Sequence, residues 1–143
     1  MRRRARERAL QFLFGLGFTD YAWEDAAPGF WEMNPTRPPA RRYAECLVRG
    51  VCEYRAELDA DIAAALDNWS LDRLGHVERA VLRIALYEMC HVSDVPPSVA
   101  INEAIEVIKR YGNDEAPRFV NGILDRLRKM VSERGVAHDE AAP

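Results

Sequence analysis

Apolar residues recur at helical spacing between residues 43 and 69, and this pattern constrains the fold more than any other feature of the chain. The steps are three or four residues long, as on one face of an α-helix, whereas a strand would alternate at every second residue. The stripe consists of Tyr43, Leu47, Val51, Tyr54, Leu58, Ile62, Leu66 and Trp69. Because it is long for one globular helix, it predicts two consecutive helices with a break.

Further helices are predicted on both sides of this stripe. Segment 77–90 is apolar around most of its circumference, which is typical of a helix buried on nearly all sides. Amphipathic patterns predict helices at about 3–16, at 98–111 and in a last segment that Asp114 caps. A glycine inside this last helix, Gly122, predicts close helix packing. With no convincing strand pattern, the chain is predicted to be all-α with six or seven helices.

The stretch 19–39 is the least regular part of the sequence. It contains four prolines, one glycine and two tryptophans, so it is predicted to be a loop with at most one short helix.

Length and composition limit the class of protein. The chain has 143 residues, of which 48% are hydrophobic and 30% charged, as expected for one soluble domain. No apolar run approaches the roughly 20 residues of a membrane span, and the basic N-terminus is not followed by a signal-peptide pattern. We therefore expect a cytoplasmic protein with no membrane association.

No motif for catalysis or cofactor binding is found. The sequence has no glycine-rich phosphate loop, HExxH or nucleophile elbow. Glu103 and Glu106 lie one helical turn apart, but no Glu-x-x-His helix accompanies them, so a solvated face is favoured over a metal site. Cys46, Cys52 and Cys90 match no metal pattern and are predicted to be buried free thiols. We expect no enzyme activity, no cofactor and no metal.

Positive charge is concentrated at the N-terminus of an otherwise acidic chain. Five of the first eight residues are arginine, although the net charge is -3. Folding of the first helix is expected to hold Arg4, Arg6 and Arg8 at a surface near the core. Arginine pairs with phosphate and stacks on unpaired bases. Patterning alone supports nucleic-acid binding and a merely solvated basic end about equally.

Three blocks of sequence together resemble a known family. They are RRRARERALQFLF at 2–14, VERAVLRIALYEM at 77–89, and VPPSVAINEAIEVIKRYG at 95–112 followed by RFVNGILDRL at 118–127. In this order they resemble the signatures of the NusB family of bacterial transcription antitermination factors. The stretch Pro28–Pro39 matches no family pattern.

The resemblance implies a fold and a function. The fold would be a single domain, 1–143, of two packed three-helix subdomains at about 1–70 and 71–135, and we expect a frayed tail at 136–143. The protein would bind boxA RNA of ribosomal RNA transcripts together with the small-subunit ribosomal protein NusE and keep elongating RNA polymerase resistant to termination. Some family members dimerise, so a homodimer is a further expectation.

The resemblance also implies site residues. The RNA-binding set would be Arg2, Arg3, Arg4, Arg6, Arg8, Arg118 and Phe119. The partner-protein set would be Phe14, Asp72, Glu78 and Glu115. A core role for Phe119 and an internal ion pair for Glu78 are the alternatives, and Asn102 and Asn121 look structural. The rival function is a helical protein-interaction module without specific RNA binding.

Overall fold

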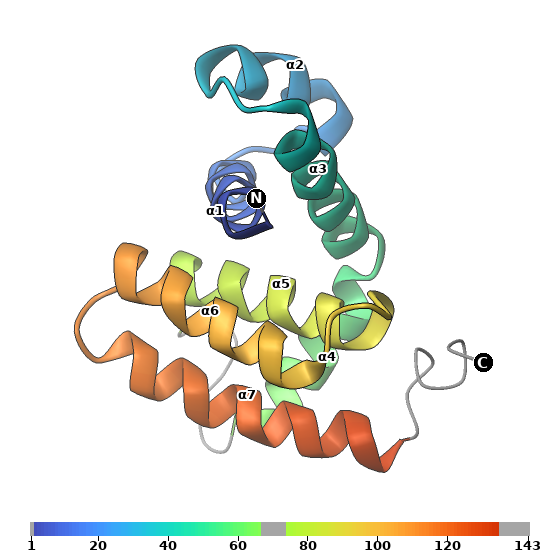
Figure 1. Cartoon of the computed structure of the whole chain (residues 1–143), viewed down its shortest axis with the longest axis vertical. Coiled ribbons are helices and arrows are strands. Elements are labelled where there is room, and N and C mark those ends of the chain that lie inside the picture. Colours follow the sequence, from blue (N-terminus) through green and yellow to red (C-terminus); the bar gives the residue numbers. More distant parts are fainter. Residues whose placement is uncertain (1, 67–73, 135–143) are drawn as a thin grey trace.

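A computed structural model of the protein describes residues 2–66 and 74–134. Within these ranges the chain forms seven helices, which confirms the all-α prediction (Figure 1). They are α1 (Arg2–Leu16), α2 (Trp23–Met33), α3 (Pro38–Glu53), α4 (Arg55–Ala65), α5 (His76–His91), α6 (Pro97–Tyr111) and α7 (Ala116–Glu133). Asp72 and the predicted tail at 136–143 lie outside the described residues.

The helices form two groups that meet at α5. In the first group α1 packs mainly against α3, and α2 contacts both. In the second group α5, α6 and α7 pack against one another, and α1 crosses α5 and α6 on the side away from α7 (Figure 1). The subdomain boundary near residue 70 stays a prediction, and the contacts of α4 with α5 and α7 favour placing α4 in the second group.

The predicted break in the long apolar stripe is confirmed. Helix α3 ends at Glu53 and α4 begins at Arg55, with Tyr54 between them. Residues Leu47 and Val51 of α3 and Ile62 of α4 are almost fully buried. Because the helix is interrupted at Tyr54, the apolar residues of α3 can pack against α1 while those of α4 pack against α5.

Helix α5 is the predicted central helix. Its buried residues lie around most of its circumference and include Leu82, Leu86 and Met89. Because α1, α3, α4, α6 and α7 all contact it, polar side chains on α5 need partners from these neighbours.

Helix α2 corrects the prediction of a mainly irregular stretch at 19–39. It has 11 residues and contains Pro28, which removes one backbone hydrogen bond. Tertiary contacts offset this loss, because Trp31 is 6% exposed and the Phe30 ring lies 4.6 Å from the Phe12 ring. The Trp31 indole also donates a hydrogen bond of 2.9 Å to Glu45.

Three smaller predictions are wrong. Asp114 does not cap α7: its N-cap residue is Glu115, without a side-chain cap, and Asn113 Oδ1 accepts the backbone N–H groups of Glu115 and Ala116 in the turn before the helix. Gly122 does not mark close packing, since nothing lies within 4 Å of a Cβ at that position. The three thiols are free as predicted, but none is fully buried, since Cys46 and Cys90 are half-buried and Cys52 is exposed.

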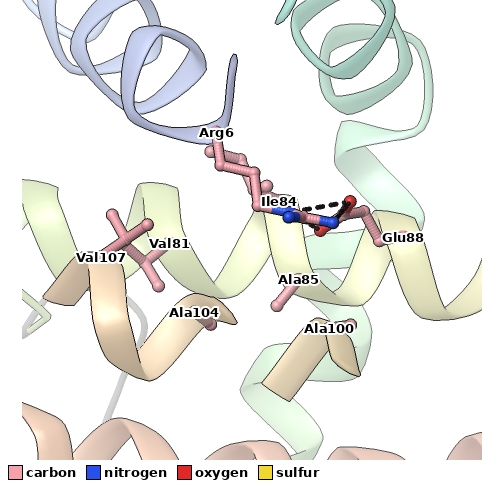
Figure 2. A pocket seen from close by; sticks show the side chains of 8 residues that line it. All are labelled: Arg6, Val81, Ile84, Ala85, Glu88, Ala100, Ala104 and Val107. Carbon is pink, nitrogen blue, oxygen red and sulfur yellow. Dashed lines mark hydrogen bonds and ion pairs between the residues drawn. The ribbon is translucent and has the colours of Figure 1, made fainter. Parts of the chain in front are cut away.

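One buried ion pair fastens α1 to α5. The guanidinium of Arg6 donates to both carboxylate oxygens of Glu88, at 3.0 Å from Nε and 2.9 Å from Nη2 (Figure 2). Arg6 is 5% exposed and Glu88 1% exposed. The hydroxyl of Tyr43, on α3, donates to the same carboxylate. Burial, together with this hydrogen bond, raises the pKa of Tyr43 far above its ordinary value, so the hydroxyl remains a donor.

This pair corrects the prediction that Arg6 lies at the surface. Figure 2 shows its side chain pointing from α1 toward Glu88, among Ile84, Ala85 and other apolar residues. Arg6 is buried because the helical repeat places it on the same side of α1 as Ala5 and Ala9, which are also buried.

We expect Glu88→Gln to lower the free energy of unfolding by roughly 3–5 kcal/mol, because it leaves the buried Arg6 charge with only Glu103, 3.5 Å from its Nη1, as a counter-charge. Urea denaturation followed by circular dichroism measures this. The control Glu57→Gln, at an exposed position of α4, should change the value by less than about 0.5 kcal/mol. Equal effects of the two variants would contradict the structural role of the pair.

Replacing two helical glycines by alanine should have opposite effects on the stability of the protein. A Cβ at Gly50 would lie 2.1 Å from Cζ of Tyr87, so Gly50→Ala should destabilise the protein by about 1–3 kcal/mol. Gly122→Ala meets open space and should stabilise it by about 0.5–1 kcal/mol through higher helix propensity. Thermal denaturation of both variants tests this, and a destabilising Gly122→Ala would show that α7 packs more closely than described.

Candidate nucleic-acid interface

The first two turns of α1 hold two accessible arginines in carboxylate pairs. Arg2 donates to Asp94 at 3.0 Å and lies over the Tyr43 ring, 4.4 Å from its centroid. Arg3 donates to both oxygens of Glu103, on α6, at 3.0 and 2.9 Å. These hydrogen bonds raise the pKa of both guanidinium groups and lower the pKa of Asp94 and Glu103. The side chains of Arg2 and Arg3 remain 36% and 54% exposed, so another anion can reach them.

Arg4 and Arg8 lie one helical turn apart, on the side of α1 nearer the connection between α2 and α3. Arg4 is exposed and contacts Glu7 at 3.5 Å. Arg8 is half-buried, and its guanidinium donates to Thr36 at 3.0 Å and to Gln11 at 2.8 Å. Because these acceptors are neutral, Arg8 keeps its positive charge uncompensated.

An open groove brings the N-terminus together with the last two helices. Its lining residues come from α1, α6 and α7, and they are Arg3, Asn102, Glu103, Ile105, Glu106, Lys109, Pro117, Arg118 and Asn121. The predicted residues Arg3 and Arg118 therefore lie on one groove, although they are far apart in the sequence. Phe119, the neighbour of Arg118, is 37% exposed.

Two residues of the predicted partner-protein set, Phe14 and Glu78, lie at the end of α1 and at the start of α5. Phe14 is 39% exposed, and its ring lies 5.2 Å from Phe18 and 6.0 Å from His76. Glu78 is half-buried at the start of α5, and Glu115 is exposed at the start of α7. Asp72, the fourth residue of the predicted partner-protein set, is among the residues that the structure does not describe.

Sequence reasoning missed several residues of these surfaces. Asn102 and Asn121, predicted to be structural, are exposed in the groove beside Lys109. Phe18 is 63% exposed and belongs to the aromatic group of Phe14. Because Phe18 lies in the turn after α1, helical spacing offered no signal for this contact.

The described residues show no sign of a metal centre or a membrane span. No three His, Cys, Asp or Glu side chains gather there in a way that could hold a metal ion. None of the seven helices is long and apolar enough to cross a membrane.

Comparison with known proteins places the chain in a family. A sequence model described as the NusB family matches residues 3–129. The chain belongs to the NusB family. It is 44% identical, over 94% of its length and 98% of the relative, to a protein of Geobacter sulfurreducens named transcription antitermination protein NusB.

Solved structures of the NusB family share the fold. T. maritima NusB superposes with a TM-score of 0.82 at 39% identity, covering 90% of this chain and 91% of that one. A crystal structure of antitermination factors NusB and NusE in complex with dsRNA contains a chain that matches with a TM-score of 0.81 at 28% identity, covering 90% and 96%. The predicted family and the NusB-like fold are thus confirmed.

The Arg3–Glu103 pair makes stability depend on pH in a defined direction. A carboxylate whose folded pKa is lowered stabilises the fold fully above its unfolded pKa of about 4.3, and the contribution is lost as the pH falls through the folded pKa. We expect Glu103→Gln to be less stable than the wild type at pH 7, with the difference shrinking below about pH 4. Urea denaturation across this range tests the expectation. Glu106→Gln, one turn along α6, is the control, and a difference that grew on acidification would contradict it.

Proposed function

We propose that this protein is a transcription antitermination factor without enzymatic activity, which binds boxA RNA of ribosomal RNA transcripts together with the ribosomal protein NusE. The observation that carries the proposal is the groove that joins Arg3 of α1 to Lys109 and Arg118, on the fold of a family with a member crystallised with NusE and dsRNA. Since the whole chain has a net charge of -3, this local positive charge favours RNA at one place while discouraging general binding.

The accessible arginines supply the affinity of this surface. Arg2, Arg3, Arg4, Arg8 and Arg118 are the proposed phosphate contacts, and Phe119 is the proposed stacking side chain for an unpaired base. Asp94 and Glu103 hold Arg2 and Arg3 in place until phosphate competes for them. Arg6 contributes differently, because its buried pair with Glu88 fixes α1 rather than reaching RNA.

The aromatic group at the end of α1 supports a protein partner. Phe14 and Phe18 present exposed rings that a partner would cover, and Glu78, Glu115 and Asp72 would add negative charge. Such a surface suits a basic ribosomal protein through charge complementarity. NusE is the proposed occupant.

The larger assembly is also part of the proposal. The pair would act in the cytoplasm on the RNA polymerase elongation complex and promote processive transcription. A homodimer stays a prediction from the family resemblance.

Paired variants should separate RNA binding from partner binding. We expect Arg3→Ala with Arg118→Ala to weaken binding of a boxA-like RNA about tenfold or more while leaving NusE binding unchanged, because phosphate contacts are lost. Phe14→Ala should weaken NusE binding by about tenfold, as loss of a central aromatic contact does, and should spare RNA binding by the protein alone. Fluorescence anisotropy with labelled RNA and calorimetry with NusE provide the two readouts.

The controls decide between this proposal and its rival. Arg128→Ala removes an exposed arginine of α7 and should have little effect on either readout. A scrambled RNA should bind more weakly than the boxA-like RNA, and NusE should enlarge the difference. If both RNAs bound equally weakly with and without NusE, the protein would be a helical interaction module with a merely basic end.

A further inference from the structure

Helix α2 lies at the outer end of the molecule. It packs on α1 and α3, and Figure 1 shows it on their far side from α5, α6 and α7. Its buried side carries Trp31. The opposite side presents Asp25, Gly29 and Met33, which are exposed and recur at four-residue steps. Together with Tyr21, just before the helix, these three residues are called the α2 face below.

The α2 face exposes an unusual amount of apolar surface. Met33 and Tyr21 are 84% and 71% exposed, more than any other large apolar side chain among the described residues. Between them, nothing lies within 4 Å of a Cβ at Gly29, so a partner can approach the backbone of α2 there. Single exposed apolar residues are ordinary, but two protruding side chains on either side of open backbone offer a contact surface.

Unpaired negative charge surrounds these side chains. The stretch 9–36 contains no lysine or arginine, and its carboxylates are Asp20, Glu24, Asp25 and Glu32. In the described parts of the chain none of these four carboxylates has an ion-pair partner, whereas carboxylates on α1, α4, α5 and α6 do pair with arginine or lysine. The charge of the α2 face is therefore left for a partner to neutralise.

The backbone of α2 adds one more hydrogen-bond acceptor. Pro28 is exposed and has no N–H, so the carbonyl oxygen of Glu24 lacks the donor that a regular helix supplies. Lysine and arginine side chains offer only donors and carry positive charge. Phosphate has the same sign as the carboxylates, so RNA is disfavoured at this face. Charge complementarity therefore selects a basic protein segment that also carries apolar side chains.

We propose that the α2 face binds a basic amphipathic segment of a further protein. Apolar side chains of that segment contact Tyr21 and Met33, and its lysines or arginines pair with Asp25 and with the neighbouring Glu24 and Glu32. This inference goes beyond the proposed function, because the groove of Arg3, Lys109 and Arg118 and the aromatic group of Phe14 contain no residue of α2.

Two synthetic peptides of about 15 residues test the chemistry of the partner. The basic peptide carries leucine at steps of three and four residues with lysine and arginine elsewhere, and the acidic peptide has glutamate at every basic position. Both are added to the full, isotope-labelled chain and followed by nuclear magnetic resonance. The basic peptide should shift the backbone amide signals of residues 21–33 and bind more tightly than the acidic one, with binding weakened by added salt.

Variants at exposed positions locate the binding. Glu32→Lys, in the last turn of α2 where a positive charge suits the helix, should weaken binding of the basic peptide roughly three- to tenfold. Tyr21→Ser with Met33→Ser removes the apolar contacts and should weaken it about tenfold. Glu133→Lys makes the same charge change at the exposed end of α7 and should leave binding unchanged.

Several outcomes would overturn the inference. They are no binding of the basic peptide to the wild type, equal losses in Glu32→Lys and Glu133→Lys, and no loss in the variant that lacks Tyr21 and Met33. A loss of NusE binding or of self-association in the α2 variants would also overturn it, because the face would then belong to NusE or to a second copy of the chain. The affinities of the variants for boxA-like RNA and for NusE should match the wild type, so failure of this inference leaves the proposed function standing.

Discussion

The buried pair of Arg6 and Glu88 is the interaction on which the arrangement of this protein depends. One carboxylate accepts hydrogen bonds from Arg6 on α1 and from Tyr43 on α3, while its own backbone lies in α5. Two charges in an apolar environment are tolerated only when their hydrogen bonds are satisfied. The pair therefore permits few positions of α1 relative to α3 and α5, and it joins the two helix groups.

The position of α1 in turn creates the candidate interface. Ala5, Arg6 and Ala9 face the core. The remaining arginines of the segment are therefore exposed, as Arg3 and Arg4 are, or half-buried, as Arg2 and Arg8 are. Asp94 and Glu103 approach Arg2 and Arg3 from other parts of the chain, whereas Arg4 pairs with Glu7 within α1. The same short segment thus anchors the fold and carries the exposed charge, which explains why its arginines have different roles.

Much of the fold could be predicted from periodicity, and the exceptions have physical reasons. The α3–α4 stripe and the buried helix α5 follow from the spacing of apolar residues alone. Helix α2 was underestimated because Pro28 opposes it locally, whereas the packing of Phe30 and Trp31 against α1 is a tertiary effect. For the candidate interface, the arginines stand out in the sequence, but the grooves that combine Arg3 with Arg118 and Arg4 with Arg37 depend on packing between distant segments.

The sequence by itself determined the helices, the concentration of arginine at the N-terminus and the resemblance to the NusB family. These properties are local or follow from residue order, so no contact between distant segments is needed to recognise them. The tertiary structure decided which arginine is buried, which arginines pair with carboxylates and which are hydrogen-bonded only to neutral groups. That outcome depends on Glu88, Glu103 and Thr36, which approach α1 only after the helices have packed.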